Sequence, residues 1–239
     1  EINLRSGIVR YGSSGISTNN IMSNYFKNII LSKCGTALTI NEGNVTISFI
    51  TLTNCGGSGI IDSSNMGENV EIFITKSIFN NIKDRSIYIQ KDGLYNINNC
   101  CFNNNTNYAI STRFCNGNIN HNIFDRNKYH IKTNYDHNII RSNEIHYNNF
   151  YQADTSIIPD GTINNINNNN FFGPNRYFID IFYTSVASDV NAKFNYWNTD
   201  EVSTYLADAE DSVLLGIPCS YHIIYLPKLS NPIKDAGIQ

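Results

Sequence analysis

Charged residues are scarce in this sequence. They make up only 15% of its 239 residues, and 17 Lys and Arg stand against 20 Asp and Glu, which gives a formal net charge of −3. Without an excess of basic charge the chain has little to attract a phosphate backbone, so we expect no nucleic acid partner. Long apolar runs are missing as well. The stretch 223–226 is among the longest, far short of the ~18 to 20 residues of a membrane span, and we expect none.

Metal-binding and redox motifs are also lacking. The six cysteines include no Cys-x-x-Cys pair and the five histidines no His-x-x-x-His pair, which argues against zinc ribbons, thioredoxin-like sites and a metal centre. We therefore expect no metal and no cofactor. A disordered chain is excluded too, because 41% hydrophobic residues are enough to fill a sizeable core.

What the chain has in place of charge is asparagine and isoleucine, about 40 and about 36 residues respectively. Asparagine is a poor helix former and isoleucine is β-branched, so this composition favours strands and turns. A bias of the genome towards AT-rich codons would produce the same composition without any functional meaning.

The sequence repeats itself with a period near 22 residues. Residues 8–16 and 52–60 have the same pattern of apolar residues, Gly and Ser, and later copies begin with Phe-Asn-Asn at 79 and 102. Each copy closes on an aliphatic residue, and we expect these residues to form one interior stack: Ile16, Leu38, Ile60, Ile87, Ile110 and Ile131. Short alternating stretches such as 45–49, bounded by Gly, Asn and Asp, predict two or three strands in each copy.

This period leaves no room for a helix in each repeat, which excludes ankyrin, tetratricopeptide and armadillo repeats, and the Leu-x-x-Leu-x-Leu phrase of leucine-rich repeats is missing. The pattern predicts an all-β parallel solenoid, in which each coil stacks on the last at ~4.8 Å. Equivalent asparagines should then form a hydrogen-bonded ladder, which we place at Asn122, Asn143, Asn169 and Asn195.

The repeated phrase, together with its ending in Ala-Ile or Gly-Ile, resembles the right-handed parallel β-helix superfamily, the pectate-lyase-like fold. The stretch 192–199, with Asn195, Trp197 and Thr199, is similar to the last coil of secreted β-helix proteins, although Asn198 stands where that family has Gly. The resemblance covers roughly 7–227. It implies one right-handed β-helix domain of about nine coils over 1–227, with a C-terminal cap from about 192, and a tail over 228–239.

The catalytic phrases of this superfamily are mostly absent. Only Asn198-Thr199-Asp200 occurs, and it lies in the cap. Asp125 and His146 are 21 residues apart, one coil, and each follows the apolar residue of its repeat. They are the weak catalytic candidates, with Arg141; the alternative is a polar column that continues Thr53, Asn80 and Asn103.

Other residues suggest surface or covalent features. Cys34 and Cys55 occupy the same repeat position one coil apart, which fits either a disulfide or a stack of free thiols. Asn44 and Asn104 begin glycosylation sequons. Three tyrosines each stand two residues before a closing isoleucine: Tyr108, Tyr129 and Tyr177. They form either a row of aromatic rings on which sugars can stack or an aromatic stack that packs a turn.

Two functions are compatible with this sequence. The first is an extracellular or cell-surface structural or adhesive solenoid that associates with glycans. The even number of cysteines is typical of proteins in oxidising compartments. Such a solenoid could also add subunits end to end at its open strand edges. The second is a polysaccharide lyase or glycoside hydrolase of the pectate-lyase-like fold, which requires three or more charged groups that converge on one face.

Overall fold

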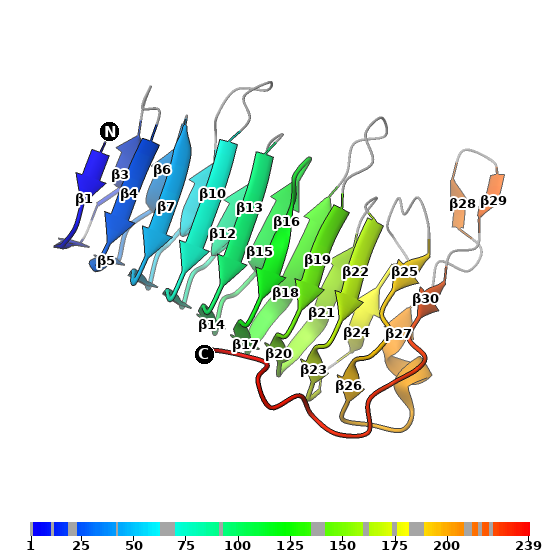
Figure 1. Ribbon diagram of the computed structural model, residues 1–239. Helices are drawn as coiled ribbons and strands as arrows, with labels where there is room; N and C mark the ends of the chain where they lie inside the picture. Colours follow the sequence, from blue (N-terminus) through cyan, green and yellow to red (C-terminus); the bar gives the residue numbers. More distant parts are fainter. Residues whose placement is uncertain are drawn as a thin grey trace.

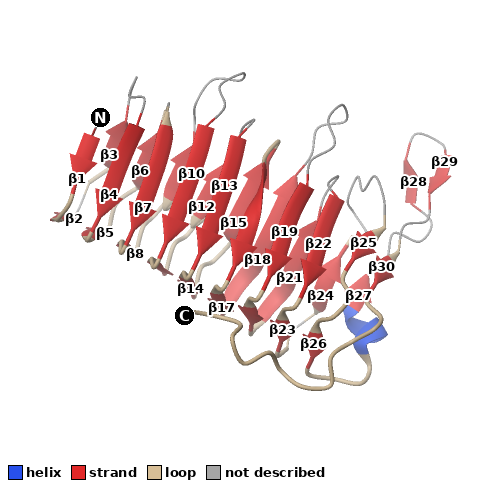
Figure 2. Cartoon of the chain, in the orientation of Figure 1, coloured by secondary structure: helices blue, strands red, loops and turns tan. Residues whose placement is uncertain are grey.

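The chain forms a parallel β-solenoid in the computed structural model, as the repeat predicts (Figure 1). The structure describes the following residues: 2–10, 12–18, 23–41, 43–62, 70–90, 93–134, 142–159, 163–173, 176–181, 189–207, 212–214, 217–219 and 222–239. Among them the single helical segment is a 3₁₀ turn, η1 (Val202–Tyr205) (Figure 2). A small antiparallel pair lies outside the solenoid, β28 (Ser212–Leu214) with β29 (Ile217–Cys219).

Three parallel sheets form the walls of the solenoid. Sheet A has ten strands: β1 (Ile2–Leu4), β4 (Ser23–Lys27), β7 (Asn44–Ser48), β10 (Val70–Thr75), β13 (Gly93–Asn98), β16 (Asn116–Asn120), β19 (Ser142–His146), β22 (Ile163–Asn167), β25 (Val190–Asn191) and β30 (Ile223–Ile224). Sheet B has nine: β2 (Gly7–Arg10), β5 (Ile29–Ser32), β8 (Thr51–Thr53), β11 (Ile78–Asn80), β14 (Cys101–Asn103), β17 (Ile123–Asp125), β20 (Asn149–Phe150), β23 (Asn170–Phe171) and β26 (Tyr196–Trp197). Sheet C also has nine: β3 (Ser14–Thr18), β6 (Thr36–Ile40), β9 (Ile60–Asp62), β12 (Ile87–Ile89), β15 (Tyr108–Arg113), β18 (Asn127–Asn134), β21 (Ala153–Pro159), β24 (Tyr177–Asp180) and β27 (Leu206–Ala207).

Each coil takes one strand from each sheet in the order A, B, C. Seven coils have a neighbouring coil on both sides in all three sheets, whereas the sequence predicted a solenoid of about nine coils. The seven begin with β4, β7, β10, β13, β16, β19 and β22. The coil of β1, β2 and β3 and the coil of β25, β26 and β27 form the two ends.

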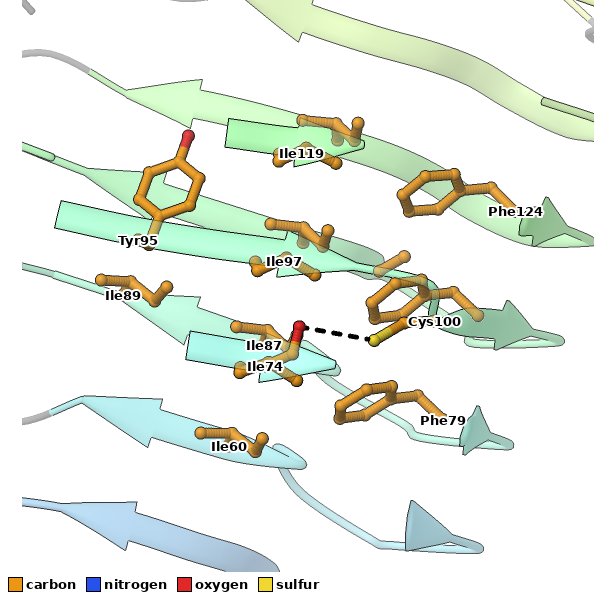
Figure 3. Packing of buried hydrophobic residues seen from close by; sticks show 14 of the residues in the cluster. Ile60, Ile74, Phe79, Ile87, Ile89, Tyr95, Ile97, Cys100, Ile119 and Phe124 are labelled. Carbon is orange, nitrogen blue, oxygen red and sulfur yellow. Dashed lines mark hydrogen bonds between the residues drawn. The ribbon is translucent and has the colours of Figure 1, made fainter. Parts of the chain in front are cut away.

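The interior consists of stacked columns. In sheet C, Leu38 pairs with Ile60, and the register continues through Ile87, Ile110 and Ile131. These side chains are buried, and Ile16 at the open end packs against the same core, so the predicted stack is confirmed. In sheet B, five phenylalanines stack with ring centroids 4.8–5.0 Å apart: Phe79, Phe102, Phe124, Phe150 and Phe171. Figure 3 shows two of these rings, Phe79 and Phe124, beside isoleucines of sheets A and C.

The corner between sheets A and B repeats one local device. The half-buried residue just before the inward-pointing side chain has positive φ, as at Asn99, His121, Tyr147 and Asn168. The next side chain then points into the core and hydrogen-bonds near the corner: Cys100 Sγ contacts the carbonyl of Asn98 at 3.2 Å, and Asn148 Nδ2 donates to that of His146 at 3.0 Å. Asparagine suits the αL position because its short polar side chain tolerates positive φ.

The asparagine ladder exists, with one correction. Asn122 Nδ2 donates to Asn148 Oδ1 at 3.1 Å, Asn148 to Asn169 at 3.0 Å, and Asn169 to Asn195 at 3.2 Å. All four side chains are buried. The prediction that Asn143 belongs to the ladder was wrong. Asn143 lies on sheet A, where its Oδ1 accepts a hydrogen bond from the Tyr95 hydroxyl at 2.5 Å.

Residues 228–239, the C-terminal tail, run back along the outer face of sheet B (Figure 1). Leu229 bridges to Tyr196 of β26, and Gln239 N donates to Asn99 Oδ1 at 2.9 Å, 140 residues away in the sequence. The tail therefore crosses several coils.

Candidate functional site

The predicted pair of Asp125 and His146 is separated in the structure. Asp125 ends β17 on sheet B, and the register of Phe124 with Phe150 places Tyr151, rather than His146, one coil further on. His146 ends β19 on sheet A, between Asn120 and Asn167. The two residues do not share a column, so this catalytic pairing was wrong.

The surroundings of Asp125 are those of a surface ion pair. Its carboxylate accepts a hydrogen bond from Arg126 Nε at 2.9 Å, and both side chains are partly exposed. Arg126 also donates to Asn103 Oδ1 at 3.2 Å. Arg141, the third candidate, lies outside the described residues.

His146 has a different set of neighbours, which spacing alone did not reveal. Glu144 points to the same side of β19, and His121 occupies the corner one coil earlier. Tyr147 connects them: its ring stacks on His121 at 5.2 Å and meets His146 edge-on at 5.3 Å. Burial lowers the pKa of His146, the Glu144 carboxylate opposes this shift, and His121 adds to it.

This cluster is a polar surface rather than a metal centre. Glu144 Oε1 accepts a hydrogen bond from Asn165 Nδ2 at 2.7 Å, and His121 Nδ1 lies 3.1 Å from Asn120 Oδ1. Within the described part of the chain, no group of three or more His, Cys, Asp or Glu side chains is arranged to hold a metal ion. Asp200, from the Asn-Thr-Asp phrase, is exposed and pairs with Lys228 at 3.1 Å.

Cys34 and Cys55 occupy equivalent buried corner positions in consecutive coils, and both thiols are free. Each Sγ faces the carbonyl two residues earlier, Ser32 at 3.6 Å and Thr53 at 3.7 Å. Burial raises the pKa of Cys55, and it raises that of Cys100, at another corner, to about 12, so these groups are protonated near neutral pH. In the structure the pair is a stack of free thiols, and a disulfide between Cys34 and Cys55 under oxidising conditions stays a prediction.

Both sequon asparagines are exposed. Asn44 begins β7, and its Oδ1 accepts a hydrogen bond from Glu71 N at 3.0 Å. Asn104 occupies a corner with φ of 54°, and its Nδ2 donates to Asn81. An N-linked glycan would replace one hydrogen of each Nδ2 and leave the amide oxygen of Asn44 able to accept from Glu71 N. Glycosylation at both positions stays a prediction.

The three predicted tyrosines lie in one outward column of sheet C. Tyr108 pairs with Tyr129, and their rings stack with centroids 4.9 Å apart. Thr155 pairs with both Tyr129 and Tyr177, so it interrupts the row. The column therefore offers one continuous pair of rings and a third ring two coils away.

Cations surround these rings. Lys128 Nζ lies 5.2 Å from the ring centroid of Tyr129, and Lys132 Nζ lies 5.9 Å from that of Tyr108. Arg176 lies over Tyr177 at 4.9 Å. Burial raises the pKa of Tyr108, and the neighbouring Tyr129 adds to the shift, so the Tyr108 phenol stays a neutral hydrogen-bond donor near pH 7. We call Tyr108, Tyr129, Lys128 and Lys132 the tyrosine face.

A concave region lies near the N-terminal end of sheet A. Its volume is about 710 Å³, and its lining combines amides, hydroxyls, one phenol and two cations: Asn3, Arg5, Ser6, Ser23, Asn24, Tyr25, Lys27, Asn28, Asn44 and Thr46. None of these residues is a carboxylate, thiol or imidazole. The region can bind hydroxyls or anions, but the described part of its lining contains no paired acid and base of the kind that a hydrolase uses.

Among the described residues no helix is long and apolar enough to cross a membrane. Comparison with family models, curated proteins and solved structures gives no match.

Proposed function

We propose that this chain is an extracellular structural or adhesive β-solenoid that associates with glycans through the tyrosine face. The stacked pair Tyr108 and Tyr129 carries the proposal. Neighbouring coils fix both rings on one rigid sheet, so little conformational entropy is lost when a sugar ring packs on them. Lys128 and Lys132 add donors for hydroxyls or carboxylates beside the rings.

The repeated polar side chains on the outer surfaces of the solenoid also suit a role in adhesion. The outer surfaces carry mostly Asn, Ser and Thr side chains, which bind hydroxyls but do not act as general bases near neutral pH. At the coil of β1, β2 and β3 the described strands are paired on one side, so their other edges offer backbone groups for end-to-end addition of a second subunit. Exposed sequons at Asn44 and Asn104 support an extracellular location.

Glycan binding is tested by retention on a panel of insoluble and soluble polysaccharides, neutral and acidic. Tyr129→Ala removes one ring of the stacked pair, and we expect its affinity to fall about tenfold, equivalent to about 1.4 kcal/mol. Tyr151→Ala is the matched control, because Tyr151 forms the same kind of stacked pair with Phe172, at 4.8 Å, on sheet B. Equal losses in the two variants, or no binding by the unaltered chain, would refute the tyrosine face.

The alternative activity, a polysaccharide lyase or hydrolase, is tested on the same panel with and without Ca²⁺. We expect binding without turnover. Turnover that disappears in Glu144→Gln or His146→Ala would assign an enzyme to the cluster on sheet A and overturn the structural proposal.

A further inference from the structure

The C-terminal tail is held on sheet B in the way that a protein holds a peptide ligand. Asn170 recognises the main chain of one tail residue at two points: its Nδ2 donates to the carbonyl of Ile233 at 2.9 Å, and its Oδ1 accepts from Ile233 N at 2.8 Å. Asn149 Nδ2 donates to the carbonyl of Ala236 at 3.1 Å. A side-chain amide has the donor and acceptor of a peptide group, so these two residues pair with main chain whatever the side chain at 233.

The two asparagines also organise each other. Asn170 Nδ2 donates to Asn149 Oδ1 at 2.9 Å. This bond fixes the amide of Asn149 with its Nδ2 directed to Ala236 and leaves the second proton of Asn170 for Ile233. The pair holds the two ends of a tight turn at residues 233–236, in which Ala236 N donates to the Ile233 carbonyl at 3.3 Å.

Selectivity comes from Gly237. Its N donates to the carbonyl of Tyr147 at 2.8 Å, its φ is +89°, and a Cβ there would lie 2.5 Å from Asn149 Nδ2. Both the positive φ and the missing space require glycine. The site therefore reads a peptide turn followed by Gly, one residue after the carbonyl bound by Asn149.

The connection between the tail and the solenoid is exposed at Leu226, Pro227 and Lys228. A tail that arrives from another molecule would re-form every contact described above, and exchange of an identical segment is a low-cost route to a dimer. We propose that the outer face of sheet B is a peptide-binding site, occupied by the chain's own tail and able to take the tail of a second copy. This inference does not depend on the proposed glycan function.

The test uses full-length chains and a labelled synthetic peptide of residues 228–239. Gly237→Val weakens the chain's own tail, so this variant should bind the peptide saturably, and at least tenfold more tightly than the wild-type chain, whose site is occupied at high effective concentration. Adding Asn170→Ala should abolish binding. Adding Asn80→Ala should not, because Asn80 lies on the same sheet in β11, where no tail contact occurs in the described residues.

Two outcomes would overturn the proposal. One is the absence of saturable binding by a natively folded Gly237→Val chain, judged by circular dichroism and by faster tryptic cleavage at Lys234 in the released tail. The other is binding that survives Asn170→Ala. Light scattering gives an independent readout: at millimolar concentration the wild-type chain should form dimers that Asn170→Ala prevents, and a strictly monomeric wild-type chain would contradict exchange.

Discussion

At the scale of single residues, the buried side chain of His130 shows how the interior holds a polar ring, with a hydrogen-bond partner at each ring nitrogen. His130 is buried between the rings of Phe124 and Phe150. Asn127 Oδ1 accepts from Asn105, so its Nδ2 must be the group that faces His130 Nδ1, at 3.0 Å. His130 Nδ1 is therefore unprotonated, and Nε2–H donates to the carbonyl of Tyr151 at 3.3 Å.

This arrangement makes stability depend on pH. Burial lowers the pKa of His130 to about 3, although the bond to Tyr151 opposes the shift. In the unfolded chain its pKa is about 6.5, so between these values the unfolded state binds the extra proton. The contribution of His130 is fully present above about pH 6.5 and is lost as the pH falls towards 3, at up to about 1.4 kcal/mol per pH unit.

We expect His130→Gln, which cannot titrate, to flatten the fall in unfolding free energy between pH 6.5 and 4, measured by chemical denaturation. His222→Gln at an exposed position is the control and should leave the slope unchanged. An equal slope in wild type and His130→Gln would show that His130 is not buried as a neutral group.

At the scale of strands and corners, the sequence predicts which residues stack in one column of a sheet, but it does not reliably predict to which of two sheets a residue belongs. The isoleucine stack of sheet C was predicted because its closing aliphatic residue recurs along the chain at steps of about one coil, as at Ile16, Leu38 and Ile60. Asn143 and His146 were misplaced because an Asn-x-apolar phrase occurs twice in that coil, at 143–145 on sheet A and 148–150 on sheet B. The step of 21 residues from Asn122 to Asn143 was therefore mistaken for one coil, whereas the coil in fact takes 26 residues, from Asn122 to Asn148.

A longer phrase would have resolved this ambiguity. Residues 148–151 read Asn-Asn-Phe-Tyr and residues 169–172 read Asn-Asn-Phe-Phe, which aligns Asn148 with Asn169 as the structure does. By contrast, the cluster of His121, Glu144 and Tyr147 combines a corner residue with residues of the next coil. No spacing rule marks such a group, because corners and strands differ in length from coil to coil.

The ladder makes a quantitative prediction. Asn148 Oδ1 accepts from both the backbone N and the Nδ2 of Asn122, at 3.0 and 3.1 Å. Asn148→Ala leaves these buried donors without that acceptor, at a cost of ~1 to 3 kcal/mol each, so we expect a loss of about 2 to 6 kcal/mol in unfolding free energy. Asn167→Ala, on the outer face of sheet A, should cost less than about 1 kcal/mol. Similar losses in denaturant titrations of the two variants would contradict the ladder's role.

At the scale of the whole molecule, each coil contacts mainly its neighbours, so its resistance to opening depends on how many neighbours it has. Within the part of the chain that the structure describes, the N-terminal coil of β1, β2 and β3 is paired on one side only, and its core residues Leu4, Val9 and Ile16 are only partly buried. The C-terminal coil is protected further. β30 pairs with β25, and the tail bridges β26, β23 and β20 through Leu229, Asn170 and Asn149.

This asymmetry predicts a gradient of hydrogen exchange. Opening an end coil breaks one interface and opening an interior coil breaks two, so amides of β1, β2 and β3 should exchange fastest, and those of β11 to β17 slowest. The coil of β25, β26 and β27 should exchange more slowly than the N-terminal coil because the tail ties it to the coils before it. Mass spectrometry of exchanged peptides measures each coil separately. Asn170→Ala should speed exchange in the tail and the C-terminal coils and leave exchange in β1, β2 and β3 unchanged. Equal exchange rates in all coils would contradict the prediction. They would mean that the solenoid opens as a single unit and that the tail gives no local protection.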